Sequence, residues 1–121
     1  MVEVHFEGRE DARLLTLRGH ATGSPAVCAA ASAMVYALAG WLRHYRAAEA
    51  RVSLRPGDSW LLCRGDEAVD VAFQIILTGL AQLAFTYPDH LRLSIGVNAL
   101  QDDDIAPWLT HAKARGKETF A

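Results

Sequence analysis

The sequence predicts an α+β domain in which two long helices pack on one face of a mostly antiparallel sheet. Two short hairpin-like segments with alternating apolar and polar residues each precede a long segment with apolar residues at helical spacing, and one further alternating segment follows. The expected element order is therefore ββαββαβ. With 121 residues, the chain is long enough for one domain with its own core and short for two.

The first hairpin and first helix are predicted from the N-terminal half. Apolar and polar side chains alternate in residues 2–7 and again in residues 13–18, with a turn between them. Ser24 is a natural N-cap, and Pro25 suits the first helical position because its missing N–H would be unpaired there anyway. We therefore expect a helix from Pro25 to about Glu49.

A second hairpin is predicted from two short apolar segments, residues 51–54 and 59–63. The segment Pro56-Gly57-Asp58 between them supplies residues that favour a tight turn. We expect one buried face of this hairpin to be formed by Val52, Leu54, Trp60 and Leu62.

The second helix is expected over residues 68–87, capped by Gly65-Asp66-Glu67 and stopped by Pro88. Apolar residues cover most of its circumference, so it needs contacts on two sides, from the sheet and another helix or from a second subunit. Residues 91–95 alternate again and predict the fifth strand. The domain is thus expected over residues 1–97.

Beyond this domain the character of the sequence changes. Residues 101–104 are acidic, Pro107-Trp108 interrupts, and residues 111–117 are weakly basic and compatible with a helix. We expect residues 98–121 to form a C-terminal tail that is loosely ordered or partly helical.

Composition and charge argue against several classes of protein. The net charge is −2 and the basic residues do not cluster, so no nucleic-acid partner is expected. The chain opens on an alternating segment rather than a leader, and polar residues interrupt both long apolar stretches, so we expect a cytoplasmic protein without membrane spans. Two cysteines, Cys28 and Cys63, form neither a disulfide framework nor a metal-ligand spacing, and no metal or cofactor is expected.

One pair of residues suggests a reaction. His20 follows the second predicted strand, and Cys28 lies at the start of the first predicted helix. A thiol at a helix N-terminus beside an imidazole is the minimal unit of a cysteine hydrolase, and the intervening loop is short enough to keep both residues at one edge of the fold. Taken singly, Cys28 could be a small core residue and His20 a strand-end cap. Cys63, within a strand, is interpreted as structural.

Neighbouring residues could support this pair. Gly19 allows close backbone approach, and Gly23 with Ser24 supplies N–H groups near the helix start that could bind an oxyanion.

Two short motifs then resemble a known family. Gly19-His20-Ala21 and the segment from Val27 to Ser32, which reads V-C-A-A-A-S, resemble the ribosomal-processing cysteine proteases, the Prp family. The order of strands and helices is also similar over roughly residues 1–97. The resemblance implies a homodimeric endopeptidase that trims the N-terminal extension of large-subunit ribosomal protein twenty-seven, with Cys28 as nucleophile and His20 as general base. It further implies that Ser32 orients the thiol or the loop.

Relatives encoded near phage structural genes imply a second substrate class, virion proteins, for a prophage-associated member. The chain also departs from the family pattern: its loop between His20 and Cys28 is several residues shorter, and Pro25 stands where the family usually has an acidic residue. A third catalytic residue, if present, must come from elsewhere in the fold. The alternatives are a non-catalytic dimeric binding or accessory paralogue, and a metal site using His5, His20 or Cys28, whose spacing matches no ligand pattern.

Overall fold

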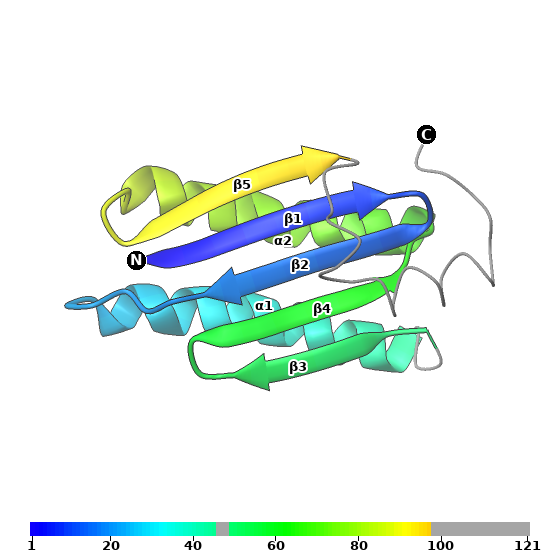
Figure 1. The fold of residues 1–121 in the computed structure, drawn as a ribbon, viewed down its shortest axis with the longest axis horizontal. Coiled ribbons are helices and arrows are strands. Elements are labelled where there is room, and N and C mark those ends of the chain that lie inside the picture. The colour runs from blue at the N-terminus through cyan, green and yellow to red at the C-terminus, as the bar shows by residue number, and fades with distance from the viewer. Residues whose placement is uncertain (46–48, 98–121) are drawn as a thin grey trace.

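The structure is a computed structural model that describes residues 1–45 and 49–97. Five strands form one sheet in the order β3-β4-β2-β1-β5, and both helices lie on one face of it (Figure 1). The predicted α+β class and order ββαββαβ are confirmed. The elements are β1 (Val2–Arg9), β2 (Ala12–Arg18), α1 (Pro25–Tyr45), β3 (Arg51–Arg55), β4 (Asp58–Arg64), α2 (Glu67–Thr86) and β5 (Leu91–Val97).

The sheet is antiparallel except at one edge. The pairs β1–β2, β2–β4 and β3–β4 are antiparallel, so both predicted hairpins are present. Strand β5 pairs in parallel with β1 because α2 crosses the sheet face and returns the chain to the end where β1 starts. The start of the chain, the end of β2 and the β3–β4 turn consequently lie at the same end of the sheet (Figure 1).

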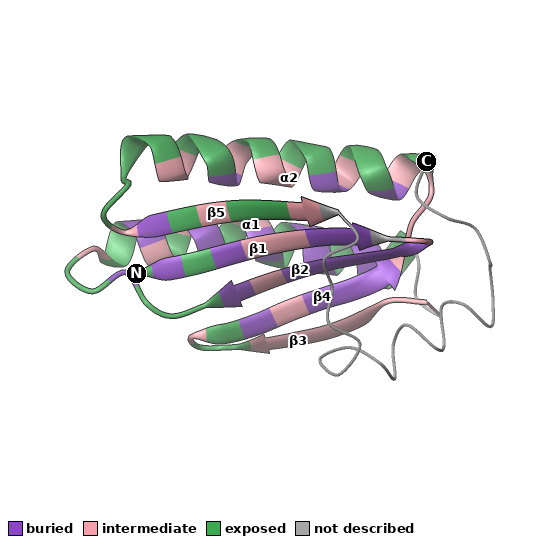
Figure 2. Ribbon diagram, turned by 45° about the horizontal axis from the view of Figure 1, so that its top comes forward, coloured by how far each residue is buried: buried purple, intermediate pink, exposed green. Residues whose placement is uncertain are grey.

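The core lies between the sheet and the two helices. Phe73 of α2 is almost fully buried and its ring centroid lies 5.3 Å from that of Phe6 on β1. Helix α1 buries one stripe at three- and four-residue spacing. Helix α2 carries its exposed residues mainly on the side away from the sheet (Figure 2). The buried stripe of α1 comprises Val27, Ala31, Val35, Leu38, Ala39 and Leu42.

The predicted face of the second hairpin was wrong. Val52 pairs with Leu61, and both belong to the core cluster or pack against it, as does Leu54. Because successive side chains point to opposite faces of a sheet, Trp60 and Leu62 lie on the face away from the helices. The tight turn fixes this register, and a shift of one residue would reverse both strands' faces.

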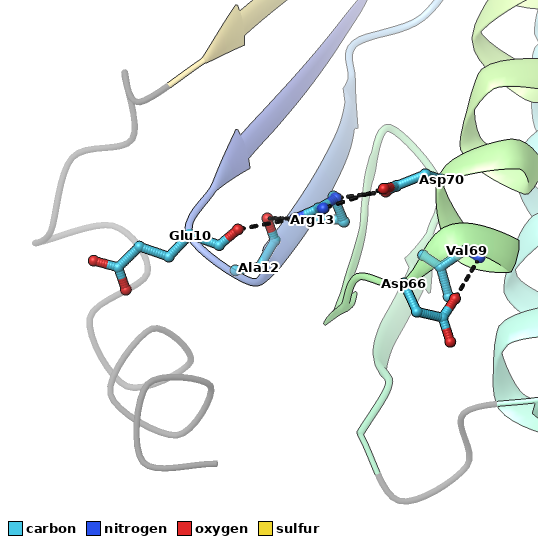
Figure 3. A network of polar contacts seen from close by, with 6 residues as sticks. All are labelled: Glu10, Ala12, Arg13, Asp66, Val69 and Asp70. Atoms are coloured by element: carbon cyan, nitrogen blue, oxygen red, sulfur yellow. Dashed lines mark hydrogen bonds and ion pairs between the residues drawn. The ribbon is translucent and has the colours of Figure 1, made fainter. Parts of the chain in front are cut away.

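The helix ends follow local chemistry. Helix α1 is described from Pro25 to Tyr45, and Glu49, the expected last helical residue, lies in a turn; residues 46–48 lie outside the described ranges, as does the tail predicted over 98–121. The Asp66 side chain accepts a hydrogen bond of 2.8 Å from the Val69 N–H at the start of α2, as expected for an N-cap (Figure 3).

A buried arginine links β2 to the start of α2 (Figure 3). Arg13 Nε lies 2.6 Å from Asp70 Oδ1, and Arg13 Nη1 donates to the carbonyl groups of Glu10 and Ala12, each at 3.2 Å. Burial lowers the pKa of the Arg13 guanidinium, while the hydrogen bond to Asp70 acts in the opposite direction. A Cβ atom at Gly65 would collide with the guanidinium, so glycine leaves the space that this side chain occupies.

Both helices are long and apolar enough, by length and composition alone, to cross a membrane. The polar residues that interrupt them therefore do not exclude a span, contrary to the sequence-based expectation. In the fold, α1 and α2 each bury a stripe against the sheet, and such core helices have the same composition.

Candidate functional site

A cavity of about 210 Å³ lies at the end of the sheet where β2 ends and α1 begins. Four residues predicted from the sequence line it: Gly19, His20, Cys28 and Ser32. The remaining lining comes from three other places, namely Val2 and Leu17 of the sheet, Ala31 and Tyr36 of α1, and the β3–β4 turn with residues Arg55, Pro56, Gly57, Asp58 and Ser59. The fold thus brings the two reactive side chains to one hollow.

The His20 imidazole lies against the β3–β4 turn. The N–H of Gly19 donates a 3.0 Å hydrogen bond to the carbonyl oxygen of Gly57, which fixes the end of β2 to the turn. Gly57 has φ +74°, and a Cβ atom there would collide with His20 Nε2. Glycine at this turn is therefore required both by the backbone conformation and by the imidazole packed on it.

The start of β1 contacts the same segment. Gly19 has φ +91°, and a Cβ atom on it would collide with the Met1 carbonyl oxygen, which is the close backbone approach expected from this glycine. The Met1 amino group donates a hydrogen bond of 2.5 Å to the carbonyl oxygen of His20. The backbone of His20 is consequently held from two sides, whereas its side chain is exposed at the cavity.

Cys28 lies in the first turn of α1 and is half-buried. Its Sγ accepts a hydrogen bond of 3.0 Å from the backbone N–H of Ala21. Residues 21–24 form a turn closed by the Ser24 N–H, which donates to the Ala21 carbonyl oxygen at 2.9 Å, with Gly23 at φ +83°. A backbone N–H is therefore aimed at the sulfur, which lies at the N-terminal end of α1.

Two predicted supporting residues lie away from the cavity. Gly23 and Ser24 are not among the residues that line it. The Ser24 N–H is used within the turn, so the oxyanion role expected for this amide has no support in the geometry. The Ala21 N–H, which the sequence did not single out, is the loop amide that faces the thiol.

Helix α1 adds Ser32 and Tyr36 to the site. Both line the cavity, and their four-residue spacing from Cys28 places all three on one face of the helix. Tyr36, which the sequence analysis did not single out, is 52% exposed and borders the hollow. Helical spacing from Cys28 was the signal that could have identified it.

Sequence reasoning missed the contribution of the β3–β4 turn. Ser59 Oγ donates to the Arg55 carbonyl oxygen at 2.9 Å and accepts from the Arg55 N–H at 3.1 Å, which fixes the turn's shape. Arg18 Nε lies 3.8 Å from Asp58 Oδ1 in an exposed pair on strands β2 and β4. No local motif reveals this proximity, since it depends on the pairing of β2 with β4.

The remaining candidates take no part in this cavity. Cys63 is buried in the core, in agreement with its structural interpretation. Within residues 1–45 and 49–97, no three His, Cys, Asp or Glu side chains come together in a group that could hold a metal ion.

The profile of a family described as cysteine protease Prp matches residues 1–92. No match to a curated protein sequence was found. A crystal structure of SMU.848 from Streptococcus mutans is 26% identical with a TM-score of 0.62, over 81% of this chain and 96% of that chain.

Two crystal structures of the essential ribosomal processing protease Prp from S. aureus are also similar. The complex with a substrate peptide is 19% identical with a TM-score of 0.65, and the complex with a covalently linked product peptide is 17% identical with a TM-score of 0.64. Each match covers 78% of this chain and 99% of the S. aureus chain.

Proposed function

Because the chain belongs to the cysteine protease Prp family, we propose that it is an endopeptidase in which Cys28 is the nucleophile and His20 the general base. The observation that carries the proposal is their common cavity, in which the Ala21 N–H donates to Cys28 Sγ at 3.0 Å. Nucleophile and base must lie at one solvent-accessible hollow for this chemistry, and here both side chains reach it.

In the proposed reaction, His20 takes the thiol proton and Cys28 Sγ attacks the carbonyl carbon of the scissile peptide bond. The C–N bond breaks, the leaving amine takes the proton from His20, and a thioester joins the N-terminal part of the substrate to Cys28. Water, deprotonated by His20, then attacks the thioester and releases a carboxylate and the free thiol. No cofactor is needed for this sequence of steps.

The surrounding residues are proposed to position the pair. Gly57 supports the imidazole from the turn side, and Ser32 lies one helical turn after Cys28 on the cavity. The Ala21 N–H limits the movement of the sulfur. Pro25 stands where the family pattern has an acidic residue, so the contacts of Gly57, Ser32 and Ala21 are proposed to orient the pair in this chain.

The proposed substrate is a cytoplasmic protein precursor whose N-terminal extension is removed. The S. aureus relatives, described as ribosomal processing proteases, bind a substrate peptide and a covalently linked product peptide. This supports a peptide substrate here, with the extension of large-subunit ribosomal protein twenty-seven as the first candidate and a phage structural protein as the second. The net charge of −2 agrees with a peptide rather than a nucleic-acid partner.

We further propose that the enzyme acts as a homodimer through the exposed face of α2. Val71, Ile75 and Phe85 on this helix are 50%, 64% and 90% exposed, an unusual amount of apolar surface for one helix. A second copy would bury it. Light scattering at micromolar concentration should give twice the chain mass, and Ile75→Glu with Phe85→Glu should give the monomer; a monomeric parent protein contradicts the dimer.

The deciding experiment is incubation of the protein with candidate precursors, followed by intact-mass measurement of the products. We expect one cut in a ribosomal precursor by the parent protein, no cut by Cys28→Ala, and a cut by Cys63→Ala, the matched thiol control. A cut only in capsid or portal precursors selects the phage substrate. Tight precursor binding without any cut, by parent and Cys28→Ala alike, would instead identify the non-catalytic accessory paralogue.

A further inference from the structure

Two polar side chains at the candidate active site have no role in the cleavage reaction proposed above. They are Arg55, the last residue of β3, and Tyr36 on α1. Both line the cavity of about 210 Å³ that also contains Cys28. Because one belongs to the sheet and the other to a helix, they border the cavity from two different elements.

The Arg55 guanidinium is a cation at the cavity without a carboxylate partner. Within residues 1–45 and 49–97, no Asp or Glu lies within ion-pair distance of this exposed side chain. Asp58 is directly opposite Arg55 in the β3–β4 register, but its carboxylate lies 3.8 Å from Arg18 Nε instead. Arg55 therefore leaves a positive charge at the cavity of a chain whose net charge is −2.

The backbone that carries this charge is held in place. The Arg55 N–H donates to Ser59 Oγ at 3.1 Å, and the buried Ser59 hydroxyl donates to the Arg55 carbonyl oxygen at 2.9 Å. In the same turn, the Gly57 carbonyl oxygen accepts from the Gly19 N–H at 3.0 Å, next to His20. The base of the Arg55 side chain is thus fixed relative to the proposed catalytic pair, which lowers the cost of ordering it around a ligand.

Tyr36 adds a hydrogen-bond donor to the same cavity. Its side chain is 52% exposed, and its hydroxyl has no hydrogen-bond partner in the part of the chain that the structure describes. A guanidinium binds a carboxylate through two parallel N–H groups, and a phenolic O–H can donate a further hydrogen bond to it. The apolar part of the cavity wall, formed by Val2, Leu17 and Ala31, can pack against the methylene groups of such a ligand.

We propose that Arg55 and Tyr36 form a carboxylate-binding subsite beside Cys28. The carboxylate belongs to a bound peptide, either as the side chain of an Asp or Glu near the scissile bond or as the terminal carboxylate. The consequence for substrate choice, a preference for peptides that carry a carboxylate at this position, rests on the proposed peptidase function. The binding of a carboxylate beside the thiol does not depend on catalysis.

The test compares two alkylating reagents of similar size on Cys28 of the full chain. Iodoacetate carries a carboxylate and iodoacetamide does not, so the ratio of their rates removes the intrinsic reactivity of the thiol. We expect this ratio to fall about threefold in Arg55→Gln and about tenfold in Arg55→Glu, as for the loss and the reversal of one nearby charge in water. Tyr36→Phe should lower it about twofold. Arg43→Gln, which removes an exposed arginine of α1 outside the cavity lining, is the control and should leave it unchanged.

A second measurement distinguishes the two sources of the carboxylate. N-acetylglutamic acid α-amide offers only a side-chain carboxylate, N-acetylglutamine only a terminal one, and N-acetylglutamine amide neither. Each compound is added during iodoacetamide labelling of Cys28. Slower labelling with the first compound identifies an acidic side chain as the ligand, and slower labelling with the second identifies a terminal carboxylate. Either protection should be lost in Arg55→Gln.

Two results would overturn the subsite. One is an iodoacetate-to-iodoacetamide ratio that is equal in the parent protein, Arg55→Gln and Arg55→Glu. The other is equal labelling of Cys28 with all three acetylated compounds. Failure of the peptidase proposal gives a different result, because the ratio would then still fall in Arg55→Gln although the parent protein cuts no precursor.

Discussion

The two ends of the sheet differ in how they are held together. At the active-site end, backbone contacts of Gly19 and Gly57 and the exposed Arg18–Asp58 pair join β2 to the β3–β4 turn. At the other end, the buried Arg13 guanidinium joins β2 to Asp70 of α2 in a network that includes two backbone carbonyl groups (Figure 3).

The Arg13 end contributes mainly to the stability of the fold, and the active-site end contributes mainly to the positioning of the proposed catalytic pair. A buried charge strongly destabilises the fold when its partner is removed, whereas an exposed pair at 3.8 Å contributes little. The active-site end instead depends on close packing at two glycines. A Cβ atom on Gly19 would collide with the backbone of Met1, and a Cβ atom on Gly57 would collide with the His20 imidazole. Substitutions at the active-site end should therefore mainly lower the rate of cleavage. Substitutions at the opposite end should mainly lower the unfolding free energy.

The largest effect is expected at the proposed base. His20→Ala should lower kcat/KM for precursor cleavage by about a thousandfold or more, because the thiol loses its proton acceptor. The melting temperature should stay unchanged, since the side chain is exposed. His44→Ala, an exposed histidine on α1, is the control and should cleave normally. Equal activity in both variants would exclude His20 as the base.

Gly57→Ala should have the next largest effect. The new methyl group displaces the imidazole, and misplacement of a catalytic group by about 1 Å costs on the order of a hundredfold in rate. Gly23→Ala is the matched control, because Gly23 also has a positive φ, +83°, and an added Cβ atom there meets nothing within 4 Å. Steady-state kinetics of both variants should separate them; normal cleavage by Gly57→Ala would show that the turn does not position His20.

At the opposite end, Asp70→Ala should lower the unfolding free energy by roughly 1–3 kcal/mol, because the buried Arg13 loses its carboxylate partner. Urea denaturation measures this change, and precursor cleavage under native conditions should be unaffected. A marked loss of cleavage under conditions where Asp70→Ala is still folded would mean that the two ends are coupled.

The smallest effect is expected from Arg18→Gln. The Arg18–Asp58 pair is exposed on both sides, so the unfolding free energy should change by less than about 0.5 kcal/mol. A larger change in the same urea experiment would mean that the active-site end carries more of the stability than its contacts indicate.

The sequence was sufficient where structure depends on local chemistry. Alternation, helical spacing and the Pro56-Gly57 turn determine the order of elements, and His20 and Cys28 could be paired because a short loop joins them. The place of Tyr36 at the cavity could also have been predicted, from its helical spacing to Cys28.

Features that depend on strand pairing could not be predicted in the same way. The contact of Gly57 with His20 requires β2 to pair with β4. The sheet face on which Trp60 and Leu62 lie depends on the strand register, and a shift of one residue would move both side chains to the other face. The placement of Leu14 opposite Leu62, on the sheet face away from the helices, follows from the same pairing.

The most direct test of the proposed Cys28–His20 pair is brief iodoacetamide labelling at neutral pH, with the modified residue identified by mass spectrometry. We expect a single adduct on Cys28 and none on the buried Cys63, at a rate that falls about tenfold or more in His20→Ala and stays unchanged in His44→Ala. A Cys28 that reacts no faster than a small free thiol, and equally fast in all three proteins, would contradict the proposed pair.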